Sequence, residues 1–156
     1  MIHHGRFDAK VAVVTGAAQG IGHTVATNLA REGGKVALVD RSELIHQVRE
    51  KLAYELPGGG AEILAVVADL EQYADCRAVM ARADAHFGRI DILINNVGGT
   101  IWARPYEHYE EQQIEAEIRR SLFPTLWCCR AVLPYMLKQG SGTIVNVSSK
   151  IGRAHV

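Results

Sequence analysis

Short apolar runs alternate with longer amphipathic segments along the chain. The runs are rich in valine, isoleucine and leucine and predict strands at residues 11–15, 35–40, 63–68, 90–94 and 143–147. The longer segments carry apolar residues one helical turn apart and predict helices at residues 20–31, 44–56, 74–87 and 109–137. Unbroken apolar strands are typical of a parallel sheet that helices cover on both faces. The pattern therefore predicts an α/β fold with a doubly wound parallel sheet, its five strands in the order 3-2-1-4-5.

The last predicted helix contains a proline. Pro124 cannot donate a backbone hydrogen bond, so we expect a kink near Ser121. The chain has no internal repeat and no linker between domains, and its 156 residues fit one domain.

Composition narrows the classes of partner. The formal net charge is zero, which argues against nucleic acid and anionic membrane surfaces, because both call for a basic patch. No stretch reaches the roughly 18 apolar residues of a membrane span. Cys76, Cys128 and Cys129 lack the spacing of a disulfide framework, which indicates reduced thiols and a cytoplasmic protein. His3 and His4 are expected to be solvated, and we expect no metal site. A small-molecule ligand fits this composition.

A glycine-rich turn separates the first predicted strand from the first predicted helix. Such a turn lets backbone N–H groups and the positive end of the helix dipole approach a diphosphate. Gly16 can make the tight turn, Gly20 leaves room for the ligand, and Gly22 lets the helix pack close to the strand. A plain strand-to-helix turn is the alternative. The residues expected to form this dinucleotide site are Thr15, Gly16, Gln19, Gly20, Ile21 and Gly22.

The spacing of this turn, Thr-Gly-x-x-x-Gly-Ile-Gly, resembles that of the short-chain dehydrogenase/reductase family. The resemblance implies a Rossmann-like domain that binds a nicotinamide dinucleotide. It also implies that Asp69, followed by Leu70, contacts the adenine ring, although Asp69 could instead cap the next helix. Asn95-Asn96-Val97-Gly98 resembles the family's Asn-Asn-Ala-Gly motif, which places Asn96, Val97 and Gly98 beside the cofactor.

Asp40 closes the second predicted strand, 18 residues after Gly22. A carboxylate at this point can accept hydrogen bonds from the adenosine ribose and would repel a 2′-phosphate, so it favours NAD over NADP. Arg41 follows and could offset that preference. A helix cap is the alternative role for Asp40, and Ser42 could serve as that cap instead.

The catalytic residues follow from the family resemblance alone. Members use a serine, a tyrosine and a lysine for acid–base catalysis while the nicotinamide exchanges hydride. Residues 142–149 resemble the family's fifth strand and assign the catalytic serine to Ser149, with Ser148 as the fallback. None of the tyrosines begins a Tyr-x-x-x-Lys pattern, so we expect this chain to bind NAD without turnover. Residues 150–156 also depart from the family pattern and are expected to be an atypical tail after an NAD-binding domain at 1–149.

Residues 95–135 resemble, more narrowly, the cis-diol dehydrogenases of aromatic-acid degradation. This resemblance implies NAD-dependent oxidation of a ring diol that carries a carboxylate, by a protein whose full-length relatives form homo-oligomers. Arg104 is the candidate partner of that carboxylate, and a solvated loop arginine is the alternative. Two other functions stay open: a catalytically silent NAD-binding fragment, and a short-chain dehydrogenase for another alcohol or ketone.

We predict roles for three polar residues of the last predicted helix. Ser121 stands where many family members carry an asparagine of a proton relay. Arg119 and Arg120 are expected to be helix-surface charges that balance Glu115 and Glu117.

Overall fold

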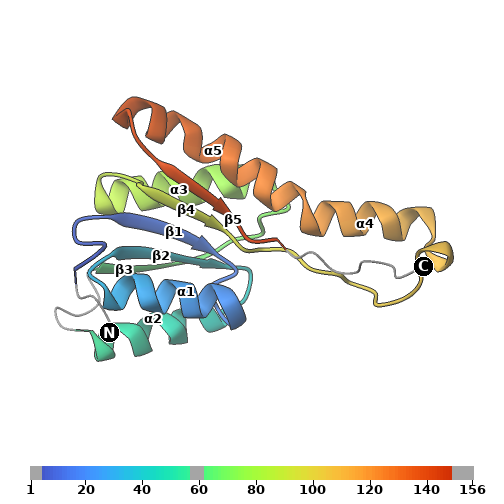
Figure 1. Cartoon of the computed structure of the whole chain (residues 1–156), viewed down its shortest axis with the longest axis horizontal. Helices are drawn as coiled ribbons and strands as arrows, with labels where there is room; N and C mark the ends of the chain where they lie inside the picture. The colour runs from blue at the N-terminus through green and yellow to red at the C-terminus, as the bar shows by residue number, and fades with distance from the viewer. Residues whose placement is uncertain (1–4, 57–61, 149–156) are drawn as a thin grey trace.

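Five parallel strands form one sheet in the order β3-β2-β1-β4-β5 in the computed structural model, which describes residues 5–56 and 62–148 (Figure 1). The predicted fold class and strand order are therefore confirmed. The strands are β1 (Val11–Thr15), β2 (Lys35–Asp40), β3 (Ile63–Val67), β4 (Ile92–Asn95) and β5 (Thr143–Asn146). The helices are α1 (Gly20–Arg31), α2 (Leu44–Glu55), α3 (Tyr73–Phe87), α4 (Glu111–Ser121) and α5 (Phe123–Gln139), with a 3₁₀ turn η2 (Tyr106–His108).

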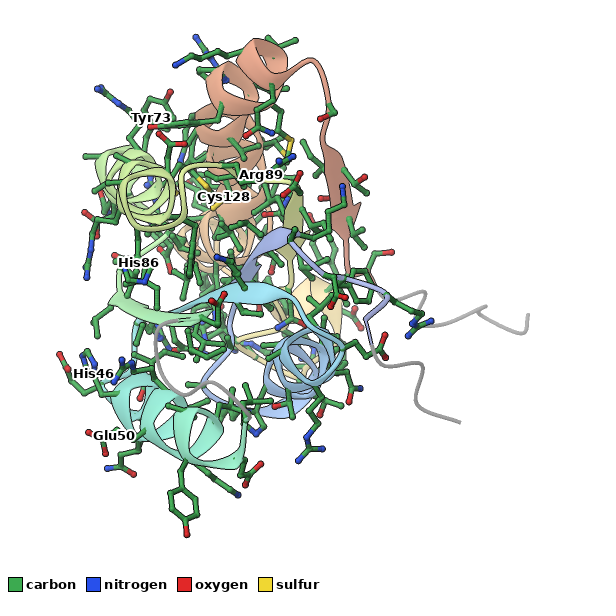
Figure 2. All side chains as sticks on the ribbon, turned by 90° about the vertical axis from the view of Figure 1, so that its left-hand side faces the viewer. His46, Glu50, Tyr73, His86, Arg89 and Cys128 are labelled. Carbon is green, nitrogen blue, oxygen red and sulfur yellow. The ribbon has the colours of Figure 1, made fainter. Side chains whose placement is uncertain are left out.

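The sheet lies between two helical layers. Alternate strand residues such as Val13 and Leu93 pack against α3 and α5, whereas Val14 and Leu38 pack against α1 and α2. In Figure 2, Cys128 on α5 lies toward α3, while His46 lies on α2 on the opposite side of the sheet. Because both faces are covered, both sets of side chains are apolar, and this explains the unbroken apolar runs.

The fourth strand begins at Ile92, two residues later than the sequence pattern suggests. The N–H and C=O of Ile90 are bonded to the side-chain amide of Gln139 at the end of α5, both at 2.9 Å. Ile90 is fully buried, so its apolar character reflects packing in the core under α5 and not a place in the strand.

The last helical stretch is two helices and not one kinked helix. α4 ends at Ser121 and α5 begins at Phe123, with Pro124 in the first turn of α5, where a missing N–H leaves no hydrogen bond unmade. The expected interruption near Ser121 is confirmed in position. Pro134, which the pattern did not single out, lies inside α5 and is exposed. The break directs α4 beyond the carboxyl edge of the sheet (Figure 1).

Candidate functional site

A cavity of about 810 Å³ lies at the carboxyl ends of the strands. That volume is in the usual range of small-molecule sites, and this edge is where ligands bind in open α/β sheets. Eleven of the residues expected to contact a cofactor line it: Gly16, Gln19, Gly20, Ile21, Asp40, Arg41, Asp69, Leu70, Asn96, Val97 and Gly98. Residues far apart in the sequence therefore meet in one place, as the family resemblance implied.

The glycine-rich turn joins β1 to α1, as predicted. Gly16 and Gly20 have φ angles of +65° and +60°, a conformation that glycine adopts without strain. A Cβ at Gly20 would meet no other atom within 4 Å, so this part of the turn borders open space. Gly22 is different: it is buried, and a Cβ there would lie 2.2 Å from the carbonyl oxygen of Gly16. Gly22 thus does not line the cavity but lets α1 start against the turn.

Thr15 does not line the cavity either, and instead joins the ends of β1 and β4. Its Oγ1 donates to the carbonyl of Ile94 (3.2 Å) and accepts from the backbone N–H groups of Asn96 (2.9 Å) and Val97 (3.2 Å). The side-chain amide of Asn96 returns to the β1 end, donating to the carbonyls of Thr15 (3.2 Å) and Gly16 (3.3 Å). These bonds shape the central wall of the cavity.

Asp40 lines the cavity at the end of β2. Its Oδ2 accepts from the N–H of Ala18 at 3.1 Å, and its Oδ1 accepts from the N–H of Ser42 at 3.0 Å. It does not cap α2, which starts at Leu44 with Glu43 as its N-cap. Ser42 Oγ accepts from the Leu44 N–H at 3.3 Å in the turn before the helix, so neither Asp40 nor Ser42 is the N-cap. Each carboxylate oxygen keeps a lone pair for a ligand hydroxyl.

Asp69 lies at the cavity on the far side of β2, where its carboxylate has a local role as well. Its Oδ1 accepts from the N–H of Glu71 at 3.1 Å, and its own N–H is held by the Asp75 carboxylate at 3.0 Å. α3 begins only at Tyr73, so Asp69 organises the turn before the helix without being its cap. The exposed Asp69 and the buried Leu70 both face the cavity.

The ends of β4 and β5 form the other side of the cavity. The Asn95 side-chain amide donates to Asn146 Oδ1 at 2.9 Å, and the N–H of Val147 donates to the Asn95 carbonyl at 2.8 Å. Val147 and the exposed Ser148 line the cavity. Ser149, the predicted catalytic serine, and the tail at 150–156 lie outside the described residues.

The loop after β4 is anchored by Glu117 of α4. Its carboxylate accepts from the N–H groups of Ile101 (2.8 Å) and Trp102 (3.0 Å) and from the Tyr109 hydroxyl (3.2 Å). Burial raises the pKa of Glu117, but these hydrogen bonds outweigh it, so the pKa lies below its ordinary value. Burial and the bond to Glu117 raise the pKa of Tyr109. Arg104 lies over the Tyr109 ring, 5.5 Å from its centroid, and does not line the cavity; its contact with a substrate remains a prediction.

Sequence reasoning missed several residues of the cavity. Ala68, Glu71 and Gly99 adjoin predicted residues, so the expected strand ends could have identified them. Arg120 and Thr125 come from the α4–α5 junction. The charge of Arg120 lowers the pKa of Glu117, in agreement with the expected balance of charges on the helix, and Arg120 lines the cavity as well, which was not expected. Ser121 also lines it, and its hydroxyl donates to the Gly99 carbonyl at 3.1 Å.

The described residues contain neither a metal-binding cluster nor a helix that could span a membrane. Residues 5–56 and 62–148 hold no group of three or more histidine, cysteine or acidic side chains arranged to bind a metal ion. None of the helices in those ranges combines the length and the apolar character needed to cross a bilayer.

Comparison with known proteins identifies the family to which this geometry corresponds. A family model described as short chain dehydrogenase matches residues 10–156. The 1,6-dihydroxycyclohexa-2,4-diene-1-carboxylate dehydrogenase of Pseudomonas putida is 65% identical over 144 residues, which cover 92% of this chain and 52% of that protein. The protein of the same name from Acinetobacter baylyi is 58% identical, over 92% of this chain and 54% of its own length. A crystal structure of NAD⁺-bound xylitol dehydrogenase matches with a TM-score of 0.85 at 28% identity, over 92% of this chain and 54% of the other.

The chain thus spans about half the length of the curated relatives it matches. The family model extends from the start of β1 through β5, and it therefore covers the whole sheet and the cavity at its edge. This chain belongs to the short-chain dehydrogenase family.

Proposed function

We propose that the cavity binds NAD along the carboxyl edge of the sheet. The observation that carries the proposal is the turn at Gly20, where a positive φ and open space meet the first turn of α1. Backbone N–H groups there would hold the diphosphate. Asp40 and Asp69 would hold the adenosine on one side, and Val147 and Ser148, which follow β5, would border the nicotinamide on the other. When bound, the nicotinamide supplies the hydride acceptor of the reaction.

We propose NAD and not NADP as the cofactor. Asp40 is half-buried at the cavity, and its carboxylate is held in place by the N–H groups of Ala18 and Ser42. A 2′-phosphate beside this carboxylate would meet like charge. Arg41 is exposed at the same edge and can offset only part of that repulsion.

Calorimetric titration of the purified chain with NAD and NADP tests both proposals. We expect saturable binding of NAD with one site per chain, and weaker binding of NADP. Absence of saturable NAD binding would remove the first proposal. Tighter binding of NADP would remove the second and leave the first intact.

We propose a cis-dihydrodiol carboxylate, of the type named in the two similar relatives, as the substrate of the whole protein. In the reaction, the ring carbon that carries one hydroxyl loses its hydrogen as hydride to the nicotinamide, and the hydroxyl loses its proton to the protein. The product is a β-keto acid. Loss of carbon dioxide from that acid leaves catechol. Ser149 is the proposed hydrogen-bond partner of the reacting hydroxyl, and Arg104 the proposed partner of the carboxylate.

Turnover assays of the whole protein test the proposed substrate. NADH formation should be faster with the carboxylated cis-diol than with the same diol lacking the carboxylate. Arg104→Ala should raise KM for the carboxylated diol only, while Arg6→Ala, which removes an arginine paired with Glu32 far from the loop, should leave it unchanged. Equal KM values for the two diols in the wild type would contradict the carboxylate preference.

A second candidate is NAD binding without turnover. None of the five tyrosines in these residues has lysine at the fourth following position, the pattern that the family uses for proton transfer. Saturable NAD binding together with no NADH formation from any diol or other alcohol would favour this candidate.

We also propose that the protein works in the cytoplasm. All three cysteines have free thiols, and Cys76 and Cys128 are buried between α3 and α5, which suits a reducing compartment. Thiol titration of the denatured protein, purified without reductant, should count three thiols per chain. A lower count would contradict the proposal.

A further inference from the structure

Arg120 is a cation in the cavity that comes from a helix and not from a strand end. It lies in the last turn of α4, is half-buried, and lines the same cavity as Leu70 and Glu71. Arg119, its neighbour, is exposed and lies over the Phe123 ring, 5.4 Å from the centroid, outside the cavity. Two adjacent arginines of one helix thus have different surroundings.

The position of Arg120 is set by contacts on both sides of it. The next residue, Ser121, is bonded through its hydroxyl to the Gly99 carbonyl at 3.1 Å. The Ser121 backbone packs against Gly98, where a Cβ would be 3.7 Å from the Ser121 carbonyl oxygen. Glu117, one turn earlier, is bonded to the loop after β4. The end of α4, with Arg120 in its last turn, is therefore held at the cavity edge.

The guanidinium of Arg120 is available for a ligand. Within residues 5–56 and 62–148 it takes part in no ion pair, and its electrostatic neighbour Glu117 already accepts from two backbone N–H groups and a hydroxyl. The cavity also holds the carboxylates of Asp40, Asp69 and Glu71, against which Arg41 and Arg120 are the cations that line it. The dianionic diphosphate of a dinucleotide that enters this cavity needs cationic neighbours.

We infer that Arg120 is a cofactor-positioning residue whose guanidinium covers the adenosine half of the bound dinucleotide. This inference rests on the proposed NAD site. The planar guanidinium stacks well on a neutral aromatic face such as adenine, and its charge offsets the carboxylates on that side. The oxidised nicotinamide ring carries a positive charge, so the same guanidinium would be unfavourable beside it. Arg120 shares its cavity with Leu70 and Glu71 on the proposed adenine side and also with Val147 on the proposed nicotinamide side. The charge of the oxidised nicotinamide is therefore what selects the adenine side for Arg120.

The test compares four forms of the chain: wild type, Arg120→Ala, Arg120→Lys and Arg119→Ala. Each is titrated with NAD and with ADP-ribose, which lacks the nicotinamide. We expect Arg120→Ala to weaken both ligands by the same factor, about five- to tenfold, the size of one cation–π contact. Arg120→Lys keeps the charge but loses the plane, so its affinity should be intermediate. Arg119→Ala should bind both ligands as the wild type does.

Each outcome distinguishes the inference from the proposal beneath it. Wild type that binds neither ligand would overturn both. NAD affinity unchanged in Arg120→Ala would overturn the inference alone. A loss for NAD without a loss for ADP-ribose would place the contact at the nicotinamide end and would also overturn it. Equal thermal unfolding midpoints of the four forms check that an affinity change is not a folding defect.

Discussion

The carboxylate of Asp40 accepts a hydrogen bond from the backbone N–H of Ala18 at 3.1 Å, so the end of β2 is tied to the turn that follows β1. One oxygen of the carboxylate orders the glycine-rich turn, while the other is held by Ser42. The same group that would recognise the ribose therefore also shapes the diphosphate site. Changing it should alter both affinity and selectivity.

Asp40→Asn removes the negative charge but keeps an acceptor for one backbone N–H. We expect it to bind NADP about tenfold more tightly relative to NAD, because the 2′-phosphate no longer meets a carboxylate. The ratio of the two dissociation constants measures this. Arg41→Ala is the control and should shift the ratio toward NAD. A ratio unchanged in Asp40→Asn would contradict the assignment of Asp40 to the ribose.

Gly22→Ala should damage the turn through crowding. Its Cβ would lie 2.2 Å from the Gly16 carbonyl oxygen, and neither backbone can move without shifting α1 or β1. Overpacking of this kind costs about 1–3 kcal/mol. We expect a lower free energy of unfolding in urea together with weaker NAD binding. Gly88→Ala, at φ +79° with open space around it, is the control: it should lose stability by about 1–2 kcal/mol but bind NAD normally.

Thr15→Val should destabilise the sheet more than Thr15→Ser. Valine has the same shape, but it leaves the N–H groups of Asn96 and Val97 without the hydroxyl oxygen that accepts from them. An unsatisfied buried group costs about 1–3 kcal/mol. Urea unfolding of the two variants measures the difference. Equal stability of the valine and serine variants would mean that the hydroxyl is not what joins β1 to β4.

Asp91 should make the protein sensitive to acid. The Asp91 side chain is 7% exposed. Its carboxylate accepts hydrogen bonds from Arg89 (2.6 and 2.8 Å) and from the N–H of Val11 (3.0 Å). Burial raises the pKa of Asp91. The hydrogen bonds from Arg89 and Val11 and the charge of Arg89 outweigh this effect, so the pKa lies below its ordinary value of 3.8. A lowered pKa in the folded state means that the stabilisation is complete above the ordinary value and is lost as the pH falls through the folded value.

The measurement is the free energy of unfolding of wild type and Asp91→Asn from neutral pH down into the acid range. We expect the wild type to be the more stable near neutrality, and the difference to shrink as the pH falls below about 4. Arg89→Ala keeps the hydrogen bond from the Val11 N–H to Asp91. Its free energy of unfolding should therefore differ less from that of the wild type than the free energy of Asp91→Asn does. A constant difference across the pH range would contradict the role given to the Asp91 charge.

Glu117→Ala should release the loop after β4. The amides of Ile101 and Trp102 lose their acceptor, so their hydrogen exchange should accelerate. Glu117→Gln keeps one acceptor oxygen and should show a smaller effect. Glu115→Ala, an exposed neighbour on the same helix, is the control and should leave both amides unchanged. Protected amides in Glu117→Ala would show that other contacts hold the loop.

The strands and the glycine-rich turn could be predicted because each rests on local pattern, and the strand order then followed from the rules for right-handed crossovers in doubly wound sheets. Val11–Thr15 and Lys35–Asp40 are unbroken apolar runs, and only covered parallel strands tolerate such runs. The backbone at Gly16 and Gly20 has positive φ angles, and the position of Gly22 has no room for a side chain. Glycine is therefore strongly favoured at all three positions, which makes the turn recognisable in the sequence. The carboxyl ends of parallel strands share one edge, and this brought Asp40, Asp69 and Asn96 to one cavity.

Contacts that cross between helices and loops were not predictable in the same way. The sequence shows two adjacent arginines, Arg119 and Arg120, and nothing in their spacing says which one faces a cavity. That choice depends on the break between α4 and α5 and on the bond from Ser121 to Gly99, 22 residues apart. Likewise, the anchoring of Trp102 by Glu117 joins a loop to a helix through side-chain and backbone geometry. Hydrophobic periodicity and glycine spacing determine the sheet and its turn, because they act through local conformation and burial; the tertiary packing alone decided which helix side chains reach the cavity.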